Sequence, residues 1–307
     1  MDFELNEGQA VVQDALLGMF ADYRALPTGA CGFFEPAPEL DRMLEESDFF
    51  SLALMEGYGA LDAALFAYEA ARLPFLVEVG ASALVAPLLG EGGLPRPIAL
   101  ADDRGGAIRN LPGARTLILL EDGVAKVASL EGAEIETLSS VLGYPFGKLA
   151  NPDALPTRTL GDGSGAALAK WWRVALAAEG AGLLQAALDA TVDYVKQREQ
   201  FGRPIGSFQA IQHRLAVCAQ LVSGCRWLAL RAADSGSESE AAVAALYVQD
   251  QMRHVVNDLH QFSGAIGLTR EYPLHLWTYR LKALQGELGG IVAQADAAMG
   301  VFSGETA

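Results

Sequence analysis

The sequence predicts a mostly helical α+β fold in which a few short strands separate two helical regions. Apolar residues recur at helical spacing before position 95 and again after position 166. Between these regions, short runs of β-favouring residues alternate with turn sequences. Hydrophobic residues make up 51% of the 307 positions and charged residues 20%, a composition that excludes a largely disordered chain and supports substantial buried cores.

Residues 1–95 are expected to form an N-terminal helical domain. Apolar and polar residues alternate at helical spacing over Gly8–Tyr23, and two further helices are expected over Asp41–Leu54 and Ala60–Leu73. Pro74 directly follows the last of these segments and marks its boundary.

Residues 96–163 are expected to form a small middle β domain. The predicted strands are Ile98–Ala101, Thr116–Leu120, Val124–Ser129 and Glu134–Leu138. The tripeptide Glu121-Asp122-Gly123 has the composition of a tight hairpin turn between the second and third strands.

Residues 164–307 are expected to form a C-terminal four-helix bundle. The predicted helical segments are Ala166–Lys196, Ile211–Ala233, Ser239–Phe262 and Pro273–Met299. Their lengths suit antiparallel packing, and the order of helices, strands and long helices along the chain indicates an α+β architecture.

The charge balance and the apolar segments exclude several classes of function. Lys and Arg total 22 against 38 Asp and Glu, a formal charge of −16 that opposes binding to nucleic acid or to an anionic membrane surface. The apolar stretch Leu61–Leu89 carries four charged residues, which argues against membrane insertion. The chain start has no basic segment followed by an apolar one, so no secretory signal is expected and a cytoplasmic location is predicted.

The three cysteines, Cys31, Cys218 and Cys225, lack the paired spacing of a metal site or a disulfide framework. Burial as small hydrophobic residues is the favoured interpretation. Gly-rich phosphate loops and the HExxH metalloprotease motif are also absent from the sequence, so no metal site is predicted.

The segment Tyr194–His213, YVKQREQFGRPIGSFQAIQH, carries the strongest indication of a binding site. A helix is expected to end before its Gly and Pro residues and another to begin near Gln209. Arg198, Arg203 and the amides of the new helix can hold an anionic group. A helical hairpin with solvated arginines explains the same residues, and their spacing alone favours that simpler interpretation.

Two motifs in this part of the chain resemble the acyl-CoA dehydrogenase family. REQFGRPIGSFQAIQH, residues 198–213, is similar to the family's Arg-x-x-Phe-Gly…Phe-Gln signature. QFSGAIGLTREYPLH, residues 261–275, is similar to its Gln-x-x-Gly-Gly-x-Gly-x-x-x-Glu-Tyr-Pro segment. The opening MDFELNEGQ resembles the family's first helix. The resemblance implies the family's fold, with an N-terminal helical domain, a middle β domain and a C-terminal four-helix bundle.

The resemblance further implies an FAD-dependent oxidoreductase of lipid catabolism that acts on an acyl-CoA thioester. In this family a carboxylate removes the α proton and hydride passes from the β carbon to the flavin. By the matching positions, Arg198 pairs with the FAD pyrophosphate, Phe201 packs on the cofactor and Gln209 hydrogen-bonds it.

The second motif implies a close-approach turn at the adenosine end of a neighbouring subunit's FAD. Its matching residues here are Gln261, Gly264 and Ala265. Ala265 replaces the second glycine of the family turn, which carries a steric penalty if the backbone there requires a positive φ.

The family's catalytic base has no counterpart at either of its usual positions. One position falls on Leu288 and the other, just before Arg173, falls on Trp172. Neither a leucine nor an indole can accept a proton. Glu287 and Glu179 are the remaining candidate bases, although Glu287 lies about 100° around a helix from position 288 and a structural role is favoured for Glu179.

The predicted middle domain is shorter than in the family and lacks its Thr-Glu-Pro-x-x-Gly-Ser-Asp segment. The main hypothesis is therefore a subunit that forms a dimer or tetramer with a catalytically complete chain and supplies FAD contacts. A complete homomeric enzyme with a relocated base is one alternative. A non-enzymatic bundle scaffold that binds no flavin is the other.

Overall fold

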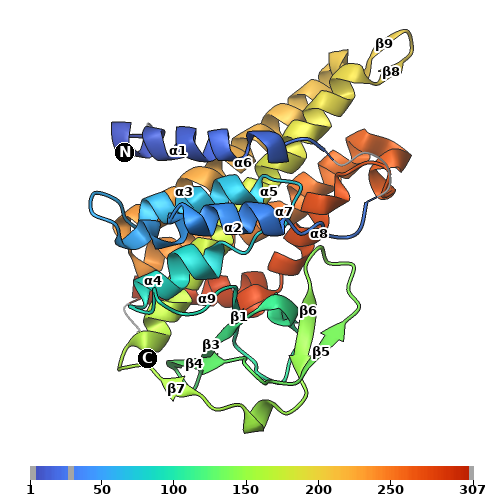
Figure 1. Cartoon of the computed structure of the whole chain (residues 1–307). Coiled ribbons are helices and arrows are strands. Elements are labelled where there is room, and N and C mark those ends of the chain that lie inside the picture. Colours follow the sequence, from blue (N-terminus) through green and yellow to red (C-terminus); the bar gives the residue numbers. More distant parts are fainter. Residues whose placement is uncertain (1–4, 27–30, 304–307) are drawn as a thin grey trace.

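Most strands lie apart from the helices in the computed structural model, which describes residues 5–26 and 31–303 (Figure 1). The strands of the middle region lie together at the bottom of Figure 1, and a short hairpin of two further strands lies at the opposite end of the molecule. This arrangement confirms the predicted mostly helical α+β fold. Residues 1–4 of the opening motif lie outside the described residues.

The N-terminal helices pack as one layer against the bundle. They and their short helical turns are α1 (Glu7–Met19), η1 (Ala21–Tyr23), α2 (Pro38–Glu46), η2 (Phe49–Leu54), α3 (Ala60–Ala71), η3 (Gly80–Val85) and α4 (Ala86–Leu88). Asn6 begins α1 because its side chain accepts a hydrogen bond from the Gln9 amide while the Gln9 side chain accepts one from the Asn6 amide, each at 2.9 Å. The predicted helix over 41–54 divides into α2 and η2 at Asp48, whose φ is 58°.

The strands of the middle region form two small sheets. They are β1 (Ile98–Ala101), β2 (Ile108–Arg109), β3 (Thr116–Glu121), β4 (Val124–Ser129), β5 (Ile135–Leu138), β6 (Phe146–Leu149) and β7 (Arg158–Thr159), with short turns η4 (Leu111–Gly113) and η5 (Pro152–Ala154). One sheet has the order β1-β3-β4-β7 and the other β2-β6-β5, and only β1 and β3 pair in parallel. The hairpin between β3 and β4 is confirmed, with Asp122 and Gly123 at φ 55° and 76°.

Three strands of the middle region were not predicted, because the sequence gives them little periodic signal. β2 and β7 have two residues each, too few to show the alternation that marks a strand. β6, FGKL, contains a glycine, and that residue packs against the side chain and backbone of β5, where a Cβ would lie 3.1–3.2 Å from Ile135 and the Glu136 carbonyl.

The C-terminal bundle contains α5 (Ser164–Gln197), α6 (Gln209–Ser235), α7 (Glu238–Ser263), α8 (His275–Leu284) and α9 (Gly290–Ser303). A small hairpin of β8 (Glu199–Gln200) and β9 (Arg203–Pro204), followed by η6 (Ile205–Ser207), joins α5 to α6. α5 packs against α3, α6, α7 and α8 and is buried on several sides. Within the described part of the chain no helix is both long and apolar enough to span a membrane.

The prediction of one helical segment over Pro273–Met299 is wrong. The chain leaves α8 after Leu284, forms η8 (Glu287–Gly289) and resumes as α9. Leu288 has left-handed dihedral angles, φ 51° and ψ 38°, and Gly289 and Gly290 also have positive φ. The glycines permit a break that apolar periodicity does not reveal.

Gly182 sets the distance between α5 and α3. A Cβ at this position would lie 2.2 Å from the Tyr68 carbonyl oxygen and 3.0 Å from the Ala71 side chain. A backbone oxygen cannot move aside without shifting α3, so any larger residue separates the N-terminal layer from the bundle.

Gly182→Ala is therefore expected to lower the free energy of unfolding by about 2–3 kcal/mol through overpacking. The matched control is Gly18→Ala in α1, where nothing lies within 4 Å of the added Cβ. That change is expected to raise the free energy of unfolding by about 0.5–1 kcal/mol, because alanine favours a helix over glycine. Urea denaturation measures both, and equal effects would contradict this account of the contact.

The cysteines of α6 are buried, as predicted, and so is Cys31. Burial raises the pKa of Cys225 to about 12 and that of Cys218 to about 11. Both thiols therefore stay protonated in the folded chain at pH values where an exposed thiol ionises.

The folded chain is expected to lose stability at alkaline pH. The pKa of Cys225 is raised above its ordinary 9.0, so its contribution is complete below about pH 9 and is lost as the pH rises from there toward about 12. Urea denaturation at neutral and at alkaline pH measures the loss. Cys225→Ala is expected to reduce it, whereas Ser223→Ala, an exposed change on the same helix, is expected to leave it unaltered; equal slopes in all three proteins would refute the assignment.

Candidate functional site

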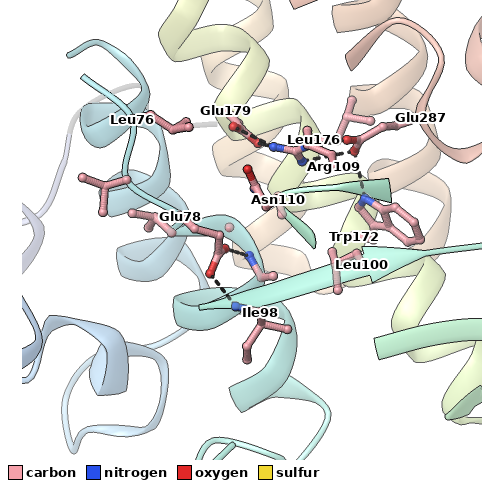
Figure 2. Close-up of a pocket in the computed structure, with 15 residues that line it drawn as sticks. Leu76, Glu78, Ile98, Leu100, Arg109, Asn110, Trp172, Leu176, Glu179 and Glu287 are labelled. Carbon is pink, nitrogen blue, oxygen red and sulfur yellow. Dashed lines mark hydrogen bonds and ion pairs between the residues drawn. The ribbon is translucent and has the colours of Figure 1, made fainter. Parts of the chain in front are cut away.

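Five side chains from the sheets and the bundle meet in a cluster centred on Arg109. Arg109 comes from β2, Tyr144 from the loop before β6, Trp172 and Glu179 from α5, and Glu287 from η8. We call this group the Arg109 cluster. Figure 2 shows the Arg109 guanidinium between the carboxylates of Glu179 and Glu287, with Trp172 beside Glu287.

The guanidinium pairs with both carboxylates at once. One terminal nitrogen of Arg109 lies 3.1 and 3.2 Å from the Oε1 and Oε2 atoms of Glu179. The other lies 3.3 Å from Oε2 of Glu287, and Nε donates to Oε1 of the same carboxylate. The three side chains are only 14–17% exposed, so water screens these pairs little.

Tyr144 and Trp172 complete the hydrogen bonding of the two carboxylates. The Tyr144 hydroxyl donates to Oε1 of Glu179 at 2.6 Å, and the Trp172 indole N–H donates to Oε2 of Glu287 at 3.0 Å. The Arg109 guanidinium also lies 4.6 Å from the centre of the Tyr144 ring, within range of a cation–π contact. Each carboxylate thus accepts from a cation and from a neutral donor.

The contacts within the cluster keep the donors Arg109 and Tyr144 in their protonated forms. Burial alone lowers the pKa of a guanidinium, but Glu179 and Glu287 outweigh it and raise the Arg109 pKa well above its ordinary value. Burial and the Glu179 carboxylate hold the Tyr144 pKa well above that of a free phenol. Arg109 therefore remains charged and Tyr144 remains a hydrogen-bond donor, so both carboxylates stay turned toward Arg109 and Glu179 is held by Tyr144 as well.

The break before α9 brings Glu287 into this cluster. The Gln249 amide donates to the carbonyls of Leu284 and Glu287 at 2.8 and 3.1 Å, and the Gln294 amide donates to the Leu288 carbonyl at 2.9 Å. The 100° separation of positions 287 and 288 assumed a regular helix, which is wrong here because Leu288 is left-handed. Leu288, at the family's base position, is buried, and Glu287 faces Arg109.

Little space remains inside the cluster. The cavity between Arg109, Trp172, Glu179, Glu287 and the segment before η3 encloses about 20 Å³. That is room for about one water molecule. Glu78 borders this cavity and accepts hydrogen bonds from the amides of Ala81 and Ile98 at 2.8 and 3.2 Å, and burial raises its pKa.

The residues predicted to contact FAD lie elsewhere, on the β8–β9 hairpin and beside it. Figure 1 shows this hairpin at the end of α5 that is farthest from the sheets. Phe201 is 92% exposed at its tip and has a left-handed φ of 56°, which is strained for a bulky residue. The Arg203 guanidinium lies 4.1 Å from the centre of the Phe208 ring. Arg198 and Gln209 are exposed, and no carboxylate of the described residues forms an ion pair with Arg198.

Gln261, Gly264 and Ala265 lie together at the end of α7 and in η7 (Gly264–Leu268), and all three are exposed. Gly264 has φ 62° and ψ −149°, a conformation that favours glycine. Ala265 has no positive φ, so the steric penalty considered for this substitution does not arise.

The sequence indicated Glu179 and Glu287 as candidate bases and Trp172 at a base position, but it did not indicate Arg109 or Tyr144 as residues of the site. Arg109 belongs to a two-residue strand, and Tyr144 lies in a loop, so neither has a periodic or motif signal. A single arginine in the apolar stretch AIRNLP is the only local sign. The contacts of Arg109 and Tyr144 with Glu179 form only because the fold places β2 and the loop before β6 beside α5.

The comparisons with known proteins concern mainly the bundle. Residues 165–290 match the family described as acyl-CoA dehydrogenase, C-terminal domain. The acyl-CoA dehydrogenase FadE34 of Mycobacterium tuberculosis is 41% identical over 125 residues, 38% of this chain and 17% of that protein. The acyl-CoA dehydrogenase IpdE2 of Mycolicibacterium smegmatis is 38% identical over 124 residues, 40% of this chain and 39% of that protein. The matched stretch thus spans less than half the length of either relative.

Solved structures extend the likeness to the whole fold. The Tcur3481–Tcur3483 steroid ACAD G363A variant superposes with a TM-score of 0.75 at 23% identity, over 97% of this chain and 98% of that one. The ChsE4–ChsE5 complex from Mycobacterium tuberculosis gives a TM-score of 0.73 at 21% identity and covers 100% of both chains. At these identities the likeness concerns the fold.

Arg109→Met is expected to lower the free energy of unfolding by about 3–5 kcal/mol, because it leaves two carboxylates poorly exposed and without a cation. Adding Glu179→Gln and Glu287→Gln to it is expected to restore most of the loss. Arg231→Met, which removes an exposed ion pair with Glu240, is the control and is expected to change little. Urea denaturation compares the four proteins, and a negligible effect of Arg109→Met would disprove the role given to the cluster.

Proposed function

We propose that this chain, a member of the acyl-CoA dehydrogenase family, acts as a subunit that contributes FAD contacts to a catalytically complete partner chain. The reaction is the α,β-dehydrogenation of an acyl-CoA thioester. One observation carries the proposal: both candidate bases are held by Arg109, while the motif expected to bind the cofactor projects into solvent.

The state of the carboxylates argues against a complete active site in this chain. Removal of an α proton requires a carboxylate within reach of the substrate, but here both carboxylates face Arg109 beside a cavity with room for about one water molecule. Glu179 accepts hydrogen bonds from Arg109 and Tyr144, and Glu287 accepts from Arg109 and Trp172. At the family's two base positions stand the apolar side chain of Leu288 and the indole of Trp172.

The hairpin is suited to the diphosphate of FAD. Arg198 and Arg203 are exposed cations close to the first turn of α6, and the chain is otherwise strongly acidic. A guanidinium binds a diphosphate through charge-assisted hydrogen bonds, and the helix N-terminus adds favourable amides. Phe201 and Phe208, with ring centres 6.2 Å apart, supply apolar surface beside these cations.

A partner chain completes this arrangement. FAD, when bound, accepts the hydride, and in this proposal the partner supplies the base and the acyl-CoA pocket. The proposal agrees with the appearance of two-protein complexes, Tcur3481–Tcur3483 and ChsE4–ChsE5, among the similar structures. Bulky acyl groups, such as sterol side chains, are the proposed substrates, because one of these structures is described as a steroid enzyme.

The proposal is tested by purifying the chain alone and together with a longer homologue from a neighbouring gene. We expect the chain alone to hold little FAD and to show no turnover, and the pair to show both. Full FAD occupancy and turnover by the chain alone would instead support a homomeric enzyme. Absence of flavin absorbance from every preparation would support a scaffold.

Arg198→Ala in the assembled pair is expected to weaken FAD binding roughly tenfold to a hundredfold, the loss of charge-assisted hydrogen bonds. Arg198→Lys is expected to retain part of the affinity, since it keeps the charge but loses the planar fork. Arg231→Ala, at the far end of α6, serves as the control. The measurement is FAD retained per complex after dialysis, and retention equal to the unaltered complex would contradict the assigned contact.

A further inference from the structure

Arg109 forms the wall between two spaces in the cleft that separates the sheets from the bundle. On one side lies the internal cavity of about 20 Å³, and on the other an open pocket of about 290 Å³. Leu100, Arg109, Trp172 and Glu287 border both spaces. Figure 2 shows the Arg109 side chain reaching across the cleft from β2 to the carboxylates of α5 and η8.

The backbone holds this side chain in place. Arg109 pairs with Phe146 of β6, and the next residue, Asn110, has a left-handed φ of 64° and donates its amide to the Pro145 carbonyl at 2.7 Å. The guanidinium is fixed at its other end by Glu179 and Glu287. Because the backbone is fixed by strand pairing, the side chain cannot swing aside without breaking its ion pairs with both carboxylates.

With Arg109 in place, the inner part of this chain's own cleft has no room for a flavin ring system. The ring is a rigid planar tricycle, and the inner cavity accommodates about one water molecule. The outer pocket is lined in part by the exposed acidic residues Asp102 and Asp103 and is closed at its inner end by Arg109, Trp172 and Glu287. Without the Arg109 side chain the two spaces would join, and the volume of that side chain would be added to their 20 and 290 Å³, which brings the joint space into the range of ligand-sized pockets.

We propose that Arg109 is the residue that excludes an isoalloxazine ring from this chain's own cleft. Glu179 and Glu287 serve as its counter-ions and make a buried guanidinium stable in that position. FAD contacted by the β8–β9 hairpin then has its ring only in the partner's cleft. This inference deepens the proposed subunit function and rests on it, and it assigns to Glu179 and Glu287 a positioning role for Arg109.

The test measures binding of riboflavin, which carries the ring without the diphosphate and adenosine, to the chain alone. Three proteins are compared by quenching of riboflavin fluorescence. They are the unaltered chain, Arg109→Ala with Glu179→Gln and Glu287→Gln, and Arg109→Met with the same two glutamines. The glutamines remove the charges that would be left without a cation in both variants, and methionine keeps most of the volume of the Arg109 side chain.

Saturable binding is expected only for the alanine variant, at least about tenfold tighter than for the methionine variant. Equal binding by the alanine and methionine variants, or none by an alanine variant that shows native circular dichroism, would overturn the proposal. If the alanine variant does not fold, the unaltered chain still tests the proposal. Saturable riboflavin binding by the unaltered chain would contradict exclusion of the ring by Arg109, and absence of binding would support it. The titration uses neither partner nor turnover, so its outcome is independent of the Arg198 test of the subunit function.

Discussion

The shared ion pair of Arg109 with Glu179 and Glu287 is the interaction on which the arrangement of this molecule depends. It joins β2, α5 and η8, three elements that are more than fifty residues apart along the chain. A single guanidinium between two carboxylates leaves the group with an excess negative charge, which the hydroxyl of Tyr144 and the indole of Trp172 stabilise by donating hydrogen bonds. Loss of one member would leave its partners poorly solvated, so the cluster holds together as a unit.

Two bulky residues have a strained, left-handed backbone, one beside the Arg109 cluster and one on the β8–β9 hairpin. Leu288 is left-handed in the break before α9, and Phe201 is left-handed at the tip of the β8–β9 hairpin. Such conformations persist where the surroundings require them. At Leu288 the requirement is visible, because Gln249 and Gln294 bind the carbonyls of the break. At Phe201 the ring touches only the edge of Phe208 among the described aromatic rings and stays 92% exposed, which agrees with an interface to a cofactor or partner.

Local motifs allowed the backbone around the predicted FAD contacts to be anticipated from sequence. The hairpin beside Arg198 that carries Phe201 lies between two helices, as its glycines and proline indicated, and Gly264 has a positive φ that favours glycine. Glu179 and Glu287 were recognised as the remaining carboxylates, but their common partner was not. Arg109 acts across the fold from a strand of two residues, and no spacing rule relates it to positions seventy or more residues away.

The fold class, the long helices α5, α6 and α7, four of the strands and the resemblance to a family could be predicted from sequence, since periodicity, turn chemistry and motifs are local properties of the chain. Three matters were left to the folded structure. It divided the segment 273–299, because left-handed backbone at Leu288 is stabilised by distant glutamines. It placed Glu287 opposite Glu179, and it filled the space between them with Arg109, because charge pairing in a poorly exposed cleft depends on which elements meet there.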